Sequence, residues 1–280
     1  MQIIRTVAGL RRWSRAARQS GQSVGLIPTM GALHEGHLSL VRAAKAGCRA
    51  VAVSIFVNPT QFGPNEDFST YPRTWDADCA LLEAVGVDVV FAPPSEEIYR
   101  PGARTFVEVE GLSDRLDGAS RPVHFRGVAT VVAKLFIAAE PDCAYFGQKD
   151  AAQVAVLRRM TADLDLPVEL VVSPIVREAD GLALSSRNRY LSADERRQAL
   201  VLSGALNAVQ AAIDSGERRA DALIGVALAS FAAEPAIKVD YIALVDWTTL
   251  EPAELAVPGT LFAVAAWVGA TRLIDNFIVG

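Results

Sequence analysis

The stretch SVGLIPTMGALHEGH, residues 23–37, changes from a strand pattern to a helix pattern across one short loop. Residues 23–27 form a short apolar run, and residues 37–46 follow with helical spacing. Gly31 and Gly36 lie in the intervening loop, where glycine lets the backbone come close to a ligand. This strand–loop–helix unit predicts the beginning of a βαβ fold.

The same alternation continues along the chain. Residues 50–57 are a continuous β-branched run, typical of a strand covered on both faces. Further strands are predicted at 87–92, 143–146 and 168–175, and helices at 76–85, 127–138 and 151–162. Strands separated by helices at this spacing predict an α/β fold with a Rossmann-like, doubly wound parallel sheet.

After residue 175 the pattern changes. Residues 177–192 are polar and loop-like, and two helices are predicted at 193–215 and 219–233. Ser192 is a natural N-cap for the first of them, with Glu195 completing a capping box. Three strands follow at 238–245, 260–267 and 271–278. We therefore expect a Rossmann-like domain over 1–176 and a smaller α+β domain over 177–280.

Composition excludes several classes of protein. The chain has 280 residues, of which 51% are hydrophobic, so it is long enough to bury a substantial core. Its net charge of -5 argues against a nucleic-acid partner, and no apolar run approaches the length of a membrane helix. No apolar segment typical of a signal peptide follows the first arginines. Cys48, Cys79 and Cys143 show no zinc spacing, so we expect reduced cysteines and a cytoplasmic location.

His34 and His37 carry the strongest chemical signal. Three residues apart at a predicted helix start, they can point the same way at the carboxyl edge of the sheet, where ligands bind. The helix dipole there favours phosphate, and imidazole N–H groups can donate to phosphate oxygens. Two other interpretations stay open: surface or capping histidines, and a metal pair, although no third ligand is evident nearby.

Two further segments add polar groups at strand ends. Gln61 follows the second predicted strand, and its amide can both donate to and accept from a hydroxy acid. Lys149 can neutralise phosphate as a point charge, Asp150 can cap the next helix, and Gln153 lies one turn inside that helix. Taken alone, these are also the residues of an ordinary turn and a solvated loop.

A fourth segment lies between the two predicted domains. Ser185, Ser186 and Arg187 place two hydroxyls and a guanidinium on a loop that also contains Gly181. Such a loop can close over a triphosphate and stabilise the leaving pyrophosphate. The alternative is a polar linker.

The order and spacing of these segments resemble the pantothenate synthetase (pantoate–β-alanine ligase) family of the nucleotidylyl-transferase superfamily. The resemblance covers roughly residues 24–192. The motifs that carry it are Pro28 to His37, Asn58-Pro59-Thr60-Gln61, Tyr71-Pro72-Arg73-Thr74, His124-Phe125-Arg126-Gly127-Val128, Gly147-Gln148-Lys149-Asp150 and Asp180 to Asn188.

The resemblance implies a role for each matching residue. His37, His34 and Lys149 would be catalytic, with His37 as the proton donor. Gln61 would bind both pantoate and β-alanine, and Gln153 would bind pantoate. The implied ATP-binding residues are Met30, Gly31, Ala32, Leu33, His34, Glu35, Gly36, His37, Gly147, Gln148, Lys149, Asp150, Val176, Leu184, Ser185, Ser186 and Arg187.

The implied reaction has two steps. Pantoate would attack ATP, with Mg²⁺ as cofactor, to give pantoyl-adenylate and pyrophosphate, and β-alanine would then displace AMP. We expect residues 1–176 to bind nucleotide and pantoate. The position of the Ser185–Arg187 loop between the domains suggests that 177–280 form a lid, the alternative being a fixed cap that only supports the fold. The protein-borne metal ligands stay unknown. Two alternatives are a nucleotidylyl transferase that acts on a phosphate ester and an RNA-binding module, which the net charge disfavours.

Three expectations concern supporting features. Asp76 and Asp78 either help to bind magnesium or the amine, or are first-turn acids favoured by the helix dipole. His124 and Arg126 either line the pantoate pocket or hold a loop. The family resemblance implies a homodimer, for which the apolar run at 50–57 offers a sheet-edge contact.

Overall fold

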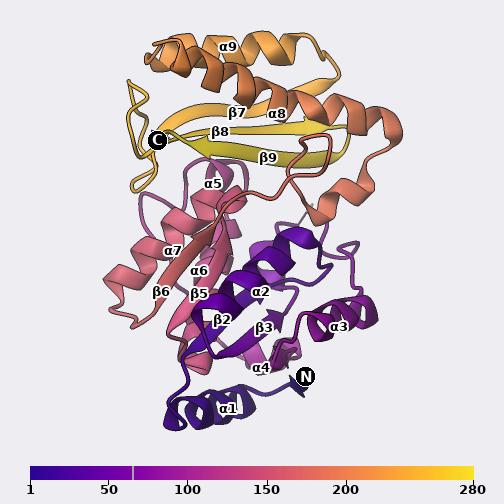
Figure 1. The fold of residues 1–280 in the computed structure, drawn as a ribbon, viewed down its shortest axis with the longest axis vertical. Coiled ribbons are helices and arrows are strands. Elements are labelled where there is room, and N and C mark those ends of the chain that lie inside the picture. Colours follow the sequence, from indigo (N-terminus) through magenta and orange to yellow (C-terminus); the bar gives the residue numbers. More distant parts are fainter. Residues whose placement is uncertain (65) are drawn as a thin grey trace. The chain divides into compact units, whose positions relative to one another are not determined.

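The computed structural model describes residues 1–64 and 66–280, which divide into two compact units (Figure 1). Unit 1 comprises residues 1–147 and 156–174, and unit 2 comprises residues 148–155 and 175–280. Each unit has its own sheet and its own apolar core.

Unit 1 is built on a parallel sheet, as the alternation of strands and helices predicted. Its strand order is β1-β4-β3-β2-β5-β6. Their bounds are β1 Gln2–Ile4, β2 Val24–Thr29, β3 Ala50–Ile55, β4 Val89–Phe91, β5 Cys143–Gly147 and β6 Glu169–Ser173. Every strand pairs in parallel with its neighbours, so the carboxyl ends of the strands meet at one edge.

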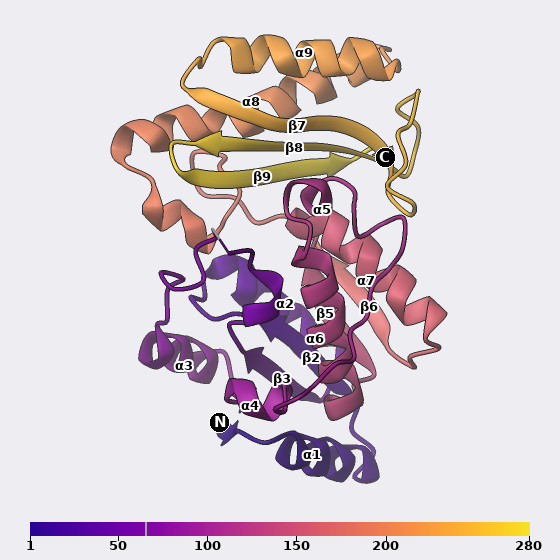
Figure 2. The same ribbon diagram turned by 180° about the vertical axis from the view of Figure 1, so that it is seen from behind.

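Helices cover both faces of this sheet. On one face α2 (Glu35–Gly47) packs over β2 and β5, and α3 (Trp75–Ala84) joins the same core through Leu82. The other face is covered by α1 (Val7–Gln19) and α6 (His124–Ala139), which come to the front when the view is turned (Figure 2). Ile27 of β2 faces α2, whereas Val24 of the same strand faces α1, as the period of a strand requires.

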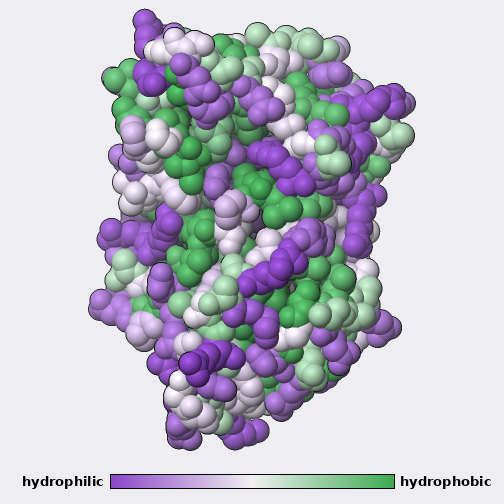
Figure 3. Space-filling view, viewed as in Figure 1, coloured by the Kyte–Doolittle hydropathy of each residue, from purple (hydrophilic) through white to green (hydrophobic). Residues whose placement is uncertain are grey.

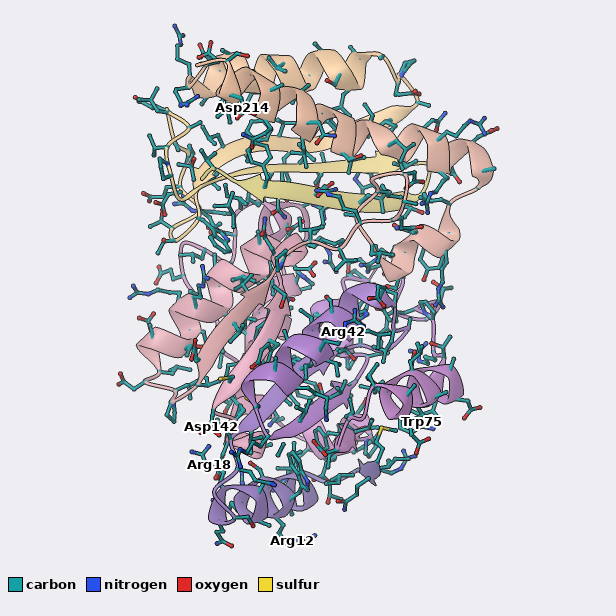
Figure 4. All side chains as sticks on the ribbon, viewed as in Figure 1. Arg12, Arg18, Arg42, Trp75, Asp142 and Asp214 are labelled. Carbon is teal, nitrogen blue, oxygen red and sulfur yellow. The ribbon has the colours of Figure 1, made fainter. Side chains whose placement is uncertain are left out.

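The first helix was missed in the sequence. Its arginine-rich segment contains a narrow buried stripe, formed by Leu10, Ser14 and Ala17. Arg18 at its end lies 3.1 Å from the Asp142 carboxylate, just before β5, and both residues are labelled in Figure 4. The sequence also did not predict β1 or the short helices α4 (Ser95–Ile98) and α5 (Asp117–Ser120).

The expectation of a sheet-edge contact at residues 50–57 is wrong. β3 occupies the interior of the sheet and pairs with β2 on one side and β4 on the other. Continuous apolar strands are typical of such central positions, because both faces and both edges are covered. This strand therefore has no unpaired edge for a second subunit.

Unit 2 has the expected α+β architecture. Helices α8 (Ala193–Asp214) and α9 (Ala220–Ala232) pack together on an antiparallel meander of β7 (Ile237–Asp246), β8 (Thr260–Val268) and β9 (Thr271–Ile278). Leu202 and Leu223 of the helices share a core with Phe262 of β8. The capping box of Ser192 and Glu195 is confirmed, with both hydrogen bonds present.

Helix α7 (Ala151–Asp163) is divided between the units, because its first five residues group with unit 2. Trp247 accounts for part of this grouping, since its indole N–H donates to the Ala151 carbonyl at 3.1 Å. Within residues 1–64 and 66–280, no helix is long and apolar enough to cross a membrane. The face in Figure 3 shows hydrophilic and hydrophobic side chains interspersed.

Candidate functional site

The loop between β2 and α2 lies at the carboxyl edge of the parallel sheet, as predicted. Gly31 and Ala32 both adopt positive φ, at 79° and 50°, and turn the chain sharply before the helix. Thr29 anchors the start of the loop: its hydroxyl donates to the Ser54 carbonyl at 2.7 Å and accepts from the Gly31 N–H at 3.2 Å. The bend is therefore part of a hydrogen-bonded structure.

His34 and His37 engage the first turn of α2 through the same ring nitrogen. His34 is the N-cap, and its Nδ1 accepts from the Gly36 N–H at 3.2 Å. The Nδ1 of His37 accepts from the His34 N–H at 3.3 Å. A neutral imidazole that accepts at Nδ1 must carry its proton at Nε2. In this tautomer the donor group of each ring is Nε2–H.

The capping interpretation of the two histidines is thus correct, but it does not compete with a ligand-binding role. Capping uses Nδ1 and fixes the tautomer, and an Nε2–H group is the kind of donor that suits a phosphate oxygen. The metal-pair interpretation gains no support, because the described residues contain no cluster of three His, Cys, Asp or Glu side chains able to hold a metal ion.

Asp78 accounts for two backbone N–H groups of this loop. The N–H groups of Ala32 and Leu33 donate to its carboxylate at 2.9 and 2.8 Å. The side chain is buried, whereas Asp76 in the same turn of α3 is exposed. Asp78 is therefore more than a first-turn acid, a role that the sequence did not reveal because the two segments are far apart in the chain.

Gln61 ends the short 3₁₀ helix η1 (Pro59–Gln61) and is buried. The amide of Asn58 donates to its Oε1 at 3.0 Å and also to the Gly127 carbonyl at 3.1 Å. This fixes the orientation of the Gln61 amide, so that its Nε2 faces the Met30 sulfur at 3.1 Å. The geometry brings together two predicted segments, the Met30 loop and Gln61.

Asn58 itself was interpreted from the sequence only as a turn residue. Its Oδ1 accepts from the hydroxyls of Tyr99 and Thr60, at 2.8 and 3.0 Å, so its amide has partners on both sides. Gly127 lets α6 lie directly against η1, because a Cβ there would fall 2.4 Å from the Thr60 carbonyl oxygen. The signal for this packing was the glycine in the His124–Val128 motif.

His124 supports the same turn from behind. Its Nδ1 lies 3.0 Å from the Gln61 carbonyl oxygen, and since a carbonyl only accepts, Nδ1 is the donor. Burial, together with the nearby charge of Arg121, lowers the pKa of His124 to about 4. Arg121 also forms a two-bond ion pair with Glu66, at 2.8 and 2.7 Å. Of the two expectations for His124, these contacts favour a residue that holds a loop.

In unit 2, the segment Gln148–Asp150 forms the 3₁₀ helix η2. The buried Asn276 of β9 holds it, donating to the carbonyls of Gln148 and Lys149 at 3.2 and 2.9 Å. Lys149 Nζ lies 3.6 Å from an Asp150 carboxylate oxygen. The sequence contained no signal for Asn276, because its partners lie more than 120 residues earlier in the chain.

The loop that contains Ser185 is also tied within unit 2. The Leu184 N–H donates to the Val176 carbonyl at 3.0 Å, which joins two predicted ATP-binding residues that are separate in sequence. Gly181, with φ of 93°, makes the turn between them. Arg177 braces this hairpin through a bidentate ion pair with the buried Asp275, at 2.6 and 3.0 Å.

The predicted site residues are therefore distributed over both units. Those in unit 1 are Met30, Gly31, Ala32, Leu33, His34, Glu35, Gly36, His37, Gln61 and Gly147. Those in unit 2 are Gln148, Lys149, Asp150, Gln153, Val176, Leu184, Ser185, Ser186 and Arg187. Gln153 lies on α7 and is half-buried.

A family model described as pantoate-beta-alanine ligase matches residues 2–278 of the chain. The chain belongs to the pantoate–β-alanine ligase family. The family resemblance found in the motifs is confirmed, and it extends to the C-terminal residues that the motifs did not reach. Membership decides against the RNA-binding alternative and against a transferase acting on a phosphate ester.

Individual relatives of this ligase agree over nearly the whole chain. A pantothenate synthetase from Acidobacterium capsulatum is 67% identical over 259 residues, covering 92% of this chain and 87% of the relative. The crystal structure of pantothenate synthetase from Thermus thermophilus matches with a TM-score of 0.94 and 46% identity, covering 100% of this chain and 99% of that one. This match confirms the predicted α/β fold class, a Rossmann-like parallel sheet with a smaller α+β domain.

A third comparison concerns a structure with ligands. Pantoate-beta-alanine ligase from Francisella tularensis, described as complexed with beta-gamma ATP and beta-alanine, matches with a TM-score of 0.81 and 32% identity. The alignment covers 99% of this chain and 97% of that one.

Proposed function

We propose that this ligase condenses (R)-pantoate with β-alanine in an ATP-dependent reaction that passes through pantoyl-adenylate and releases AMP and pyrophosphate. The observation that carries the proposal is the first turn of α2. There, two imidazoles use Nδ1 as an acceptor from the backbone and act as Nε2–H donors at the carboxyl end of β2. Family membership supplies the substrates.

In the first step, a pantoate carboxylate oxygen attacks the α-phosphorus of ATP. The bond from that phosphorus to the bridging oxygen breaks, and pyrophosphate leaves with the electron pair. A carboxylate is already a nucleophile, so the step needs alignment and charge cancellation more than a base. We assign His37 as the proton donor and His34 as a second phosphate ligand, since neutral Nε2–H groups can stabilise the oxygens without prior protonation.

Gln61 is the proposed contact for pantoate and β-alanine. Because Asn58 occupies its Oε1, the amide is set to donate from Nε2. A fixed donor suits the carboxylate and hydroxyl oxygens of pantoate, and we add Gln153 as a second pantoate ligand. In the second step, the amine of β-alanine attacks the acyl carbon, the bond to AMP breaks, and the nitrogen loses one proton.

We assign the remaining nucleotide contacts to the loop residues Met30 to His37, to Gly147 to Asp150, to Val176 and to Leu184 to Arg187. Lys149 and Arg187 would balance the charge of the triphosphate and of the leaving pyrophosphate. Magnesium enters the proposal as part of the MgATP substrate, because Mg²⁺ is usually bound through substrate phosphates and water. A lid role for residues 177–280 remains part of the same proposal.

Two further proposals concern the cellular state of the protein. We propose a cytoplasmic enzyme, since its three cysteines are free thiols. We also propose a homodimer, on family membership alone. Light scattering tests the dimer: a mass of two chains is expected, and a monomer mass at all concentrations contradicts it.

Product analysis tests the reaction. The purified chain is incubated with MgATP and pantoate, with and without β-alanine, and nucleotides and acids are separated by chromatography. AMP, pyrophosphate and pantothenate in equal amounts, all dependent on β-alanine for sustained turnover, are expected. Formation of ADP and free phosphate would exclude the adenylate route.

A further inference from the structure

The loop before α2 is held in its shape by a residue from another helix. The carboxylate of Asp78 accepts from the Ala32 N–H through Oδ2, at 2.9 Å, and from the Leu33 N–H through Oδ1, at 2.8 Å. Oδ1 also accepts from the hydroxyl of Thr74 at 3.0 Å. Both oxygens are thus used, and the residue is only 2% exposed.

Most of the hydrogen bonds of this carboxylate lie outside its own helix. Its own backbone N–H is bonded to the Thr74 carbonyl, as in any first turn, while the side chain reaches across to a loop more than 40 residues earlier in the chain. Buried carboxylates are costly unless hydrogen bonds compensate them, and here three neutral donors do so. The burial of the Asp78 carboxylate is therefore favourable only when the loop places its N–H groups against it.

The loop has a conformation that needs such support. Ala32 has φ of 50°, a left-handed conformation that is unfavourable for an L-residue other than glycine. Gly31, also left-handed, lies so close to Asp78 that an added Cβ would be 3.0 Å from Oδ2. The hydrogen bonds from the two successive N–H groups to the charged carboxylate offset this cost and stabilise this one conformation of the loop.

We propose that Asp78 is a positioning residue for the nucleotide. It fixes the N–H groups of Ala32 and Leu33, and through them the direction in which the chain enters α2 at His34. It does not contact the reactants in this proposal, which rests on the proposed function of the His34 and His37 pair. Loosening the bend would misplace both imidazoles at once. His34 is the N-cap of α2, and its N–H donates to Nδ1 of His37, so a shift of His34 also moves the partner of His37.

Asp78→Asn and Asp76→Asn form a matched pair. Both remove one charge from the same turn of α3, but Asp76 is exposed. The asparagine at 78 has a single oxygen, so its NH₂ group must face one of the two N–H donors. Loss of one charge-assisted bond lowers the catalytic efficiency for ATP by about 10- to 100-fold. We expect this for Asp78→Asn, and a change of less than about twofold for Asp76→Asn.

Two readouts separate positioning from general damage. Amide hydrogen exchange should speed up in a peptide spanning residues 30–34 of Asp78→Asn, while a peptide from β3 stays protected. Calorimetry with the non-cleavable α,β-methylene analogue of ATP should show weakened binding, with the KM for β-alanine nearly unchanged. If the two variants have equal ATP kinetics, or if exchange in residues 30–34 is unchanged, the inference is overturned.

Thr74→Val keeps the inference testable if Asp78→Asn does not fold. The Thr74 side chain makes no cap bond to α3, so the substitution removes mainly the donor to Asp78. A smaller loss of ATP efficiency, with faster exchange in the same loop peptide, supports the inference; unchanged values overturn it. A wild-type chain that makes no pantothenate would instead contradict the proposed function, and amide exchange would still test the loop.

Discussion

The rings of His34 and His37 lie with their centroids 4.1 Å apart and their planes tilted by 42°. Each accepts a backbone N–H through Nδ1, so the helix start itself sets the protonation pattern of both rings. Two neutral donors held side by side can contact phosphate oxygens together. The proposed function assigns both rings to phosphate oxygens, and this shapes the predictions that follow.

Replacing His37 distinguishes the two ring nitrogens. His37→Ala should lower turnover by about 10²–10³-fold, the usual cost of one transition-state donor, with little change in melting temperature. His37→Gln carries an amide nitrogen near the position of Nε2, whereas the shorter His37→Asn reaches only near Nδ1. Steady-state kinetics should rank the glutamine variant above the asparagine variant. The reverse order, or near-normal activity of the alanine variant, would contradict the assigned donor.

Replacing Gln61 tests the pantoate contact. Gln61→Ala should raise the KM for pantoate and leave ATP affinity largely intact. Gln61→Glu should be at least as harmful, because Asn58 still donates to one oxygen and the other oxygen replaces the Nε2 donor with a negative charge facing the pantoate carboxylate. Separate titrations of the two substrates measure this. A loss confined to ATP would refute the assignment.

His124 predicts a pH dependence of stability. Its pKa is about 4 in the folded chain, because it is buried and close to Arg121, and about 6.5 when unfolded. The unfolded state therefore takes up a proton first, and stability is lost as the pH falls from about 6.5 towards 4. Between pH 7 and 5 this amounts to about 2 kcal/mol.

The comparison variant for that prediction is His124→Gln, which cannot take up the proton. Glu66 and Asp117, the acidic groups near His124, are present in both proteins. Urea unfolding at pH 7 and pH 5 should show a larger loss in the wild type than in the variant. Parallel losses would mean that His124 is not held neutral.

Arg187 tests the coupling of the two steps. If its guanidinium helps to retain the adenylate, Arg187→Ala should release pyrophosphate faster than it forms pantothenate, because escaped pantoyl-adenylate hydrolyses. Coupled assays for the two products give the ratio directly. A ratio of one in the variant would remove this role, and Arg189→Ala, two residues along and exposed, serves as the control.

The sequence predicted what depends on local pattern. Buried strands such as β3 and the capping box of Ser192 follow from neighbouring residues, and so does the histidine pair at a helix start. Arg18 illustrates what local pattern hides, since α1 is stabilised by contacts with residues near β5. The central position of β3 also depends on which strands pair, which no local window contains.

The supporting residues of the site were hidden for the same reason. Asp78 and Asn58 look like a helix-start acid and a turn residue, because their partners in the Ala32 loop and α6 lie far away in the chain. Asn276 is an ordinary strand residue until η2 is placed beside it. The spacing of the proposed catalytic and binding residues made them recognisable in the sequence. The residues that orient them had no such pattern.

The most direct test of the adenylate mechanism follows one oxygen atom. Pantoate labelled with ¹⁸O in its carboxylate is turned over with MgATP and β-alanine, and the products are examined by mass spectrometry. If the carboxylate attacks the α-phosphorus and the amine then breaks the acyl bond, one ¹⁸O atom must appear in each AMP and none in pyrophosphate. AMP without label, or label in free phosphate, would contradict the account.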